Sequence, residues 1–237
     1  MTKVRSLPPL ALLAGGLATR LRPITETIPK SMVEVAGEPF IAHQLRLLVR
    51  EGIGDIVLCT GYLGEMIEAF VGNGAAFGCR VRYSSDGETL LGTGGALRRA
   101  LPMLGETFWV MYGDSYLDIS FAPVFQAYEA SGLPALMTVF GNEGRWDTSN
   151  VEFAGGRILR YNKVDRTPAM SYIDYGLGIV AAETMRSQAP GAAFDLADLY
   201  RDLAQQGALA GYEVTQRFYE IGSPAGLAEA DSYLRGR

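Results

Sequence analysis

Hydrophobic residues in the first half of the chain follow two alternating patterns. Short apolar runs with the length of buried β-strands lie at 10–14, 55–59, 80–83 and 108–111. Between them, segments whose apolar residues recur every three to four positions, as in amphipathic helices, lie at 40–50, 64–70 and 94–101. Strands that alternate with helices in this way predict βαβ units. We therefore expect an α/β fold with a mostly parallel mixed sheet and helices on both of its faces.

The second half of the chain has a different pattern. Its shorter predicted strands lie at 135–140, 150–153, 158–161 and 173–180, and its predicted helices lie near 195–206 and 224–234. We interpret this half as a continuation of the same sheet. The sequence thus predicts a single domain over 1–237, with a first half (1–130) and a second half (131–237). Ligands of such sheets bind at the carboxyl ends of the strands, which is where we look for a site.

Size and charge narrow the choice of partners. A chain of 237 residues with 48% hydrophobic content can bury about 70–75% of its unfolded surface, enough for one large domain. A net charge of −5 argues against nucleic acid or an anionic membrane as a partner, and no run approaches the ~20 apolar residues of a membrane helix. We interpret Cys59 and Cys79 as reduced thiols, which predicts a cytoplasmic location. A homodimer is compatible with the sequence but not required by it.

The segment after the first strand is the strongest chemical signal. Ala14 is followed by Gly15-Gly16 and then by two cations, Arg20 and Lys30. Glycines let successive N–H groups approach an anion closely, and the cations supply fixed positive charge. The spacing matches neither a Walker loop nor a dinucleotide fingerprint. We interpret the segment as a cradle for a triphosphate.

Two further signals follow later strands. Asp114 follows the apolar strand at 108–111 after Tyr112-Gly113, and a carboxylate held rigidly just past a strand end could bind Mg²⁺. Gly92-Thr93 begins a glycine-rich turn ahead of a predicted helix. Alternatively, Asp114 only caps the segment that follows it, and the glycine-rich turn only connects the strand to the helix without binding a ligand.

The cradle reads Gly-Gly-x-x-Thr-Arg-Leu-x-Pro-x-Thr-x-x-x-Pro-Lys over 15–30, which resembles the sugar-1-phosphate nucleotidyltransferase family. The resemblance implies a Rossmann-like nucleotidyltransferase fold, Mg²⁺ as cofactor, and a nucleoside triphosphate and a sugar 1-phosphate as substrates. It implies that 1–130 is the nucleotide-binding half and 131–237 the sugar-phosphate-binding half. It implies nucleotide binding by Ala14, Gly15, Gly16, Thr19, Asp86, Gly92 and Thr93. It implies catalytic roles for Arg20, Lys30, Asp114 and Lys163, and metal binding by Asp114 and Glu220. It implies sugar-phosphate binding by Asn150, Asn162, Lys163, Asp174 and Tyr175.

The chain departs from the family pattern at several positions. Ala18 replaces a third glycine of the cradle, so we expect altered loop geometry there. Asn162 replaces the usual acid before Lys163, Gly176 replaces an asparagine, and Glu220 replaces the usual aspartate. We find no hexapeptide period of the kind that forms a C-terminal left-handed β-helix in many family members, so we expect a transferase core alone.

The choice of base rests on Asp86. A carboxylate accepts two adjacent donors, which suits the N1–H and amino group of guanine better than the edge of uracil, so GTP is favoured over UTP. Overall the chain looks most like the bacterial D-glycero-D-manno-heptose 1-phosphate guanylyltransferases, which would place it in nucleotide-sugar supply for cell-surface polysaccharides. The N-acetylmuramate 1-phosphate uridylyltransferases come second. A non-catalytic nucleotide-sugar-binding subunit and a cytidylyltransferase acting on phosphocholine stay as alternatives.

Overall fold

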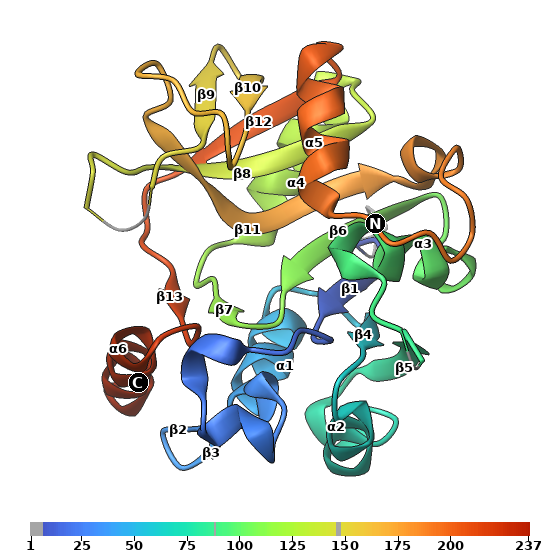
Figure 1. The fold of residues 1–237 in the computed structure, drawn as a ribbon, viewed down its shortest axis with the longest axis vertical. Coiled ribbons are helices and arrows are strands. Elements are labelled where there is room, and N and C mark those ends of the chain that lie inside the picture. The colour runs from blue at the N-terminus through green and yellow to red at the C-terminus, as the bar shows by residue number, and fades with distance from the viewer. Residues whose placement is uncertain (1–6, 88, 146–147) are drawn as a thin grey trace, which may run out of the picture.

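The computed structural model describes residues 7–87, 89–145 and 148–237, and at its centre is a nine-stranded sheet (Figure 1). The spatial order is β5-β4-β1-β6-β11-β8-β12-β10-β9. The neighbours among β5, β4, β1 and β6 are parallel, as are β8 and β12, while the other neighbours are antiparallel. The predicted α/β class and mixed sheet are therefore confirmed, with most parallel pairings in the first half of the chain. The strands are β1 (Leu10–Leu13), β4 (Asp55–Thr60), β5 (Arg80–Ser85), β6 (Thr107–Tyr112), β8 (Ala135–Gly141), β9 (Val151–Ala154), β10 (Arg157–Tyr161), β11 (Tyr172–Ala181) and β12 (Leu209–Val214).

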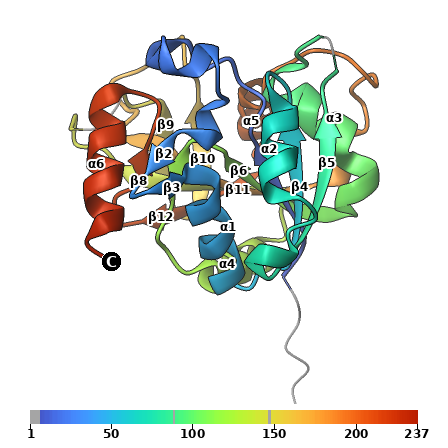
Figure 2. The ribbon, with the colours of Figure 1, turned by 90° about the horizontal axis from the view of Figure 1, so that it is seen from below.

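Helices cover both faces of the sheet. Helices α3 and α5 pack on one face, where Leu97 and Leu196 join one core cluster, and α1, α2 and α4 cover the other, where Leu45 and Phe121 join a second. Helix α6 packs near one end of the molecule and α3 lies at the opposite end (Figure 2). No helix within the described ranges is both long enough and apolar enough to cross a membrane. The helices are α1 (Phe40–Arg50), α2 (Gly64–Val71), α3 (Gly92–Leu104), α4 (Phe121–Ser131), α5 (Leu196–Gln205) and α6 (Pro224–Arg235), with 3₁₀ turns η1 (Thr19–Leu21), η2 (Ile24–Glu26), η3 (Lys30–Met32), η4 (Ala75–Phe77) and η5 (Ala182–Met185).

Two small sheets lie outside the central one. Strands β2 (Glu34–Val35) and β3 (Glu38–Pro39) form a hairpin, and α6 packs beside it. Strand β7 (Ser115–Tyr116) pairs antiparallel with β13 (Tyr219–Glu220), so that Glu220 lies opposite Ser115. This second pairing joins the segment after β6 to the segment before α6, although more than a hundred residues of chain separate them.

The hydrophobic pattern predicts most elements but not all. The helix expected at 40–50 has those bounds, whereas the helix expected at 94–101 begins at Gly92 and ends at Leu104. The pattern does not predict α4, whose apolar residues lie around much of the helix, nor β12, which carries Gly211 in its interior. The cradle is built from the turns η1, η2 and η3 and is not a plain loop.

Candidate functional site

The register of the parallel strands brings the ends of four strands into line. Leu13 at the end of β1 pairs with Cys59 of β4 on one side and with Tyr112 of β6 on the other. Thr60 at the end of β4 pairs in turn with Ser85 of β5. All four carboxyl ends therefore lie at one edge of the sheet, and the segments that follow them meet there.

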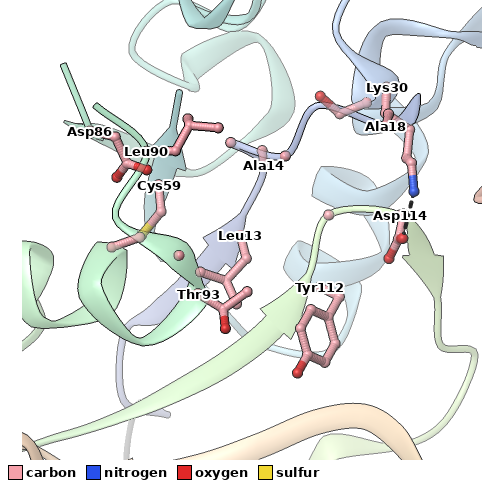
Figure 3. Close-up of a pocket in the computed structure, with 16 residues that line it drawn as sticks. Leu13, Ala14, Ala18, Lys30, Cys59, Asp86, Leu90, Thr93, Tyr112 and Asp114 are labelled. Carbon is pink, nitrogen blue, oxygen red and sulfur yellow. Dashed lines mark hydrogen bonds and ion pairs between the residues drawn. The ribbon is translucent and has the colours of Figure 1, made fainter. Parts of the chain in front are cut away.

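A cavity of about 240 Å³ opens at this edge (Figure 3). Its walls combine segments from β1, β5, β6 and α3, which the sequence alone places far apart. Thr19, Arg20 and the predicted sugar-phosphate residues do not line it. The predicted residues that line it are Ala14, Gly15, Gly16, Lys30, Asp86, Gly92, Thr93 and Asp114.

The cradle needs glycine at Gly15, because its backbone packs closely against the segment after β4. A Cβ on Gly15 would lie 3.1 Å from the Gly61 nitrogen, whereas a Cβ on Gly16 would meet no atom within 4 Å. Space is thus open beside Gly16. Ala18 has φ 50° and ψ 43°, the left-handed conformation that glycine adopts more easily, at a cost of about 1–2 kcal/mol for other residues. Its carbonyl accepts bonds from the Thr25 hydroxyl (2.8 Å) and the Leu21 N–H (3.1 Å), which hold this turn without a third glycine.

Two cations and two carboxylates gather at the edge of the cavity. Lys30 Nζ lies 2.8 Å from Asp114 Oδ2, with side chains 17% and 30% exposed. A Cβ built on Gly222 would touch the Glu220 carboxylate and lie 3.0 Å from an Arg20 guanidinium nitrogen and 3.4 Å from Lys30 Nζ. Arg20 therefore belongs to this cluster although it does not line the cavity. We call Arg20, Lys30, Asp114 and Glu220 the charged cluster.

Glu220 reaches the charged cluster through the pairing of β7 with β13. The N–H of Ile221 donates to the carbonyl of Asp114 (2.9 Å), and the Glu220 carboxylate accepts bonds from the Gly222 N–H and the Ser223 hydroxyl. The contacts around Gly222 and the Lys30–Asp114 ion pair keep the two carboxylates of the cluster within about 10 Å of each other. Direct sharing of one Mg²⁺ would need about 4 Å between the two ligand oxygens, and a larger separation needs water between a carboxylate and the ion. Among the described residues, His, Cys, Asp and Glu side chains form no group of three or more that could hold a metal.

Asp86 lies in the wall of the cavity, 7% exposed. Its Oδ2 accepts a bond from the Leu91 N–H (3.1 Å), while its Oδ1 is buried with no hydrogen-bond partner. Burial raises the pKa of this carboxyl, although the Leu91 N–H and the charge of Arg99 oppose the shift. An acceptor oxygen without a partner, on a residue that lines a cavity, is suited to a donor from a ligand.

The first turn of α3 is occupied by protein contacts. The Thr93 hydroxyl donates to Asp195 Oδ1 (2.9 Å) and accepts a bond from the Leu196 N–H (2.8 Å). The N–H groups of Gly94 and Gly95 both donate to the Phe194 carbonyl. These contacts join the segment before α5 to the first turn of α3, of which Gly92 and Thr93 line the cavity.

Two of the residues expected to bind the sugar phosphate, Asn150 and Asp174, are hydrogen-bonded to each other beside and within β11. Asn150 Oδ1 accepts a bond from the Asp174 N–H (3.2 Å), and the Asp174 carboxylate accepts bonds from the Gly176 N–H (3.0 Å) and the Tyr161 hydroxyl (3.4 Å). Burial raises the pKa of Asp174, against the opposing charge of Lys163. Lys163 itself is exposed.

Asn162 and Tyr175 have contacts of another kind. Asn162 Oδ1 accepts bonds from the N–H groups of Val164 and Asp165, so this oxygen shapes its own turn. Tyr175 is 2% exposed, and its ring packs 5.9 Å from that of Phe218 in the core cluster opposite α3 and α5. The structure does not bring the Tyr175 ring to the group around Asp174.

Sequence reasoning missed several residues of the site. Gln44 is fully buried in α1, and its Nε2 donates to the carbonyls of Tyr112 (3.2 Å) and Ser115 (2.8 Å), which flank Asp114. The sequence signal that could have identified Gln44 is that it is a polar residue within the apolar stripe of α1. Ser31 lines the cavity, 2% exposed, with a hydroxyl that has no partner, and only its position next to Lys30 indicates it.

Comparisons with known sequences find a family and relatives that align with most of the chain. A family model described as nucleotidyl transferase matches residues 11–149. N-acetylmuramate alpha-1-phosphate uridylyltransferase of Neisseria meningitidis is 31% identical and aligns with 93% of this chain and 96% of its own. The catalytic subunit beta of mannose-1-phosphate guanylyltransferase of Danio rerio is 27% identical over 90% of this chain, which spans 61% of that protein.

Solved structures share the fold. A putative glucose-1-phosphate thymidylyltransferase from Bacillus anthracis superposes with a TM-score of 0.84 at 21% identity, covering 97% of this chain and 96% of that one. HddC from Yersinia pseudotuberculosis, in complex with GMP-PN, superposes with a TM-score of 0.79 at 20% identity, covering 96% of this chain and all of that one. These likenesses extend over the central sheet and both layers of helices.

Proposed function

The chain belongs to the nucleotidyl transferase family, and we propose that it transfers the nucleotidyl group of a nucleoside triphosphate to a sugar 1-phosphate, releasing pyrophosphate. It is an enzyme, since its relatives across nearly its whole length are sugar-1-phosphate nucleotidyltransferases. The observation that carries the proposal is the shared cavity. The cradle with Lys30, Asp86, the first turn of α3 and Asp114 all line it.

The reaction is a displacement at the α-phosphorus. An oxygen of the sugar phosphate attacks, the bond from the α-phosphorus to the bridging β-oxygen breaks, and pyrophosphate leaves with the electron pair. Arg20 and the cradle amides would hold the β and γ phosphates, while Lys30 and Lys163 would neutralise charge on the reacting groups. Because the attacking oxygen is already anionic, positioning and electrostatics suffice without a covalent intermediate.

The charged cluster fits a Mg²⁺ ion. Asp114 and Glu220 supply two hard oxygen ligands within about 10 Å of each other, and Mg²⁺ commonly takes one or two carboxylates and completes its shell with substrate phosphates and water. We propose these two residues as its protein ligands. When bound, the ion would neutralise charge on the phosphates.

We propose guanine as the base, on the strength of Asp86. Its unpartnered Oδ1 lies in the cavity wall, and an ionised carboxylate accepts from the paired donors of guanine. Heptose 1-phosphate as the sugar follows from the sequence resemblance alone. We place the reaction in the cytoplasm, in keeping with free thiols at Cys59 and Cys79, the first of which has a pKa raised to about 12 by burial.

A second candidate function has its own support. The Neisseria meningitidis relative, a uridylyltransferase named for N-acetylmuramate 1-phosphate, aligns with almost the full length of both chains, which the guanylyltransferase relatives do not. UTP-dependent transfer to N-acetylmuramate 1-phosphate is therefore the alternative to test beside GTP.

One experiment separates these functions. The purified enzyme is given GTP, UTP, ATP or CTP with Mg²⁺ and a panel of heptose, mannose, glucose and N-acetylmuramate 1-phosphates, and pyrophosphate release is measured. We expect turnover with GTP and a heptose or hexose 1-phosphate, and loss of turnover when Mg²⁺ is chelated. Turnover with UTP and N-acetylmuramate 1-phosphate alone would establish the second function, and no release with any pair would refute both.

A further inference from the structure

Gln44 is a polar side chain in the buried face of α1, and it makes both of its donor bonds to one turn of the chain. Its Nε2 donates to the carbonyl of Ser115 (2.8 Å) and to that of Tyr112 (3.2 Å). Both partners are acceptors, so the NH₂ group must face them, and the orientation of the amide follows from its bonds. Its Oε1 is buried and has no hydrogen-bond partner among the described residues. Gln44 therefore bonds the turn between β6 and β7 and leaves its own acceptor unsatisfied.

Packing alone would favour an apolar residue at this position of α1. The other residues of this helix face are apolar, and Phe40, Ile41, Leu45 and Leu48 are as fully buried as Gln44. A buried amide with one unpaired atom is unfavourable in such surroundings. An apolar side chain would avoid that cost but would remove the donor that the helix gives to two backbone carbonyls. The benefit of Gln44 therefore lies in the bonds that it makes to the turn.

The two amide bonds hold the chain on both sides of Asp114. Tyr112 ends β6 and Ser115 begins β7, and only Gly113 and Asp114 lie between them. Because one side chain bonds the carbonyls at both ends of this short segment, the backbone of Asp114 has little freedom to move. The Ser115 hydroxyl adds a bond to Asp114 Oδ1 (3.2 Å). The Asp114 carboxylate is thus positioned through its own backbone as well as by its ion pair with Lys30.

The same turn also positions the second carboxylate of the charged cluster. Ser115 lies opposite Glu220 in the pairing of β7 with β13, and the Ile221 N–H donates to the Asp114 carbonyl (2.9 Å). Glu220 is therefore registered against the segment that Gln44 bonds. A shift of this segment would move Asp114 directly and Glu220 through the strand pairing.

We propose that Gln44 is a positioning residue for the metal site, a buried support in α1 that both carboxylates of the charged cluster share. This role rests on the proposed function, in which Asp114 and Glu220 bind Mg²⁺. Mg²⁺ requires nearly octahedral ligands at about 2.0–2.1 Å, so a small displacement of either carboxylate weakens its binding. Gln44 does not line the cavity, so it acts on the ion only through the turn. Residues that support metal ligands in this way commonly contribute about 10–100-fold to metal affinity or activity.

Two variants remove this support in different ways. Gln44→Met fills a similar space without a donor, whereas Gln44→Ala leaves room in which water can bond the two carbonyls. Gln44→Ala carries the test if Gln44→Met does not fold, and urea unfolding shows which variants are folded. Leu48→Ala is the matched control, because it truncates another fully buried side chain of α1 and removes no hydrogen bond.

The first measurement is amide hydrogen exchange of peptides that cover 111–116, made without metal or nucleotide. We expect exchange in these peptides to be at least about threefold faster in the Gln44 variants than in the parent protein, relative to peptides from β8, because the turn opens locally more often. Leu48→Ala should leave that ratio unchanged. This measurement reports the hold on the turn independently of catalysis.

The second measurement is pyrophosphate release at varied Mg²⁺, with the triphosphate and sugar 1-phosphate that the parent enzyme uses best. We expect the Mg²⁺ concentration for half-maximal rate to rise about tenfold in the Gln44 variants, the lower end of the range for residues that support metal ligands. KM for the triphosphate at saturating Mg²⁺ should change less than about twofold, since the cradle is intact. A purely structural role would lower the rate with the amount of folded protein and leave the Mg²⁺ requirement unchanged, as we expect for Leu48→Ala.

The possible outcomes separate the role of Gln44 from the proposed function. Unchanged exchange at 111–116 in a folded Gln44 variant would overturn the hold on the turn, and loss of the fold in both variants would reduce Gln44 to a structural residue. Faster exchange with an unchanged Mg²⁺ requirement, or an equal change of that requirement in Leu48→Ala, would overturn the link to the metal site. No pyrophosphate release from the parent enzyme with any substrate pair would instead refute the proposed function, and the metal role of Gln44 would fall with it.

Discussion

Lys30→Ala is expected to separate the chemical role of this residue from its structural one. Lys30 Nζ and Asp114 Oδ2 are 2.8 Å apart, and the two side chains are 17% and 30% exposed. Exposed ion pairs contribute under about 1 kcal/mol, whereas removing one partner of a buried pair costs about 3–5 kcal/mol. This half-buried pair lies between these limits, so we expect the free energy of unfolding to fall by about 1–2 kcal/mol. The variant should therefore remain folded.

The effect on activity should be larger than a generic loss of stability explains. Lys30 is one of two cations in the charged cluster, and the transition state concentrates negative charge on phosphate oxygens. We expect kcat/KM to fall at least about tenfold, which corresponds to about 1.4 kcal/mol or more of transition-state stabilisation. Arg20→Ala should have an effect of similar size, since its guanidinium approaches the same point beside Gly222.

The assay is pyrophosphate release, measured alongside urea unfolding of the same preparations. Arg46→Ala is the control, because it removes a cation from an ion pair with Glu38 that lies outside the cavity lining. This control should retain normal turnover. Near-normal turnover of folded Lys30→Ala would refute the role of Lys30, and an equal loss in Arg46→Ala would show that the assay reports stability only.

Three further predictions concern individual carboxylates. Asp86→Asn should weaken the use of GTP more than that of UTP, because the amide presents a donor to the donors of guanine; equal losses in kcat/KM for both triphosphates would contradict this. Asp114→Ala should nearly abolish turnover, and Glu220→Asp should be tolerated. Glu220→Ala should raise the Mg²⁺ concentration needed for half-maximal rate; an unchanged Mg²⁺ titration of this variant would show that Glu220 is not a metal ligand. Burial raises the pKa of Asp174, so stability is lost as the pH rises from the ordinary pKa of an aspartate through the raised pKa. Asp174→Asn should therefore melt above the parent protein at pH 7.5, by a margin that shrinks as the pH falls toward the ordinary aspartate pKa; a lower melting temperature at pH 7.5 would contradict the sign.

The nucleotide side of the site could be predicted from the sequence because it depends on local chain chemistry. Gly15 and Asp114 each lie just past a strand end, Lys30 ends the cradle that follows β1, and the βαβ pattern implies parallel strands whose ends share one edge. Parallel strands therefore bring the segments that carry Gly15, Lys30 and Asp114 to the same edge of the sheet. The structure confirms the fold and brings these residues together, while their individual roles stay predictions.

The remainder of the site depends on contacts that no local pattern encodes. Gln44 supports the backbone around Asp114 from the middle of a helix, and Asp195 reaches Thr93 from the segment before α5. Each is an ordinary residue of its own element, a buried amide or a helix cap. Gln44 and Asp195 reach the segments around the cavity only because of tertiary packing. The burial of Tyr175 likewise depends on tertiary packing, against the rings of Phe140 and Phe218.

The pairing of β7 with β13 has a consequence for the time course of folding. Parallel strands β4, β1 and β6 come from the first half of the chain and can pair as soon as that half is available. The contact between Ile221 and Asp114 must instead close a loop of more than a hundred residues, and contacts of such long sequence separation form slowly because their entropic cost precedes their gain. During refolding, a probe of the nucleotide cavity should thus recover before catalytic turnover does. The enzyme would pass through a state that holds the triphosphate cradle but lacks its second carboxylate.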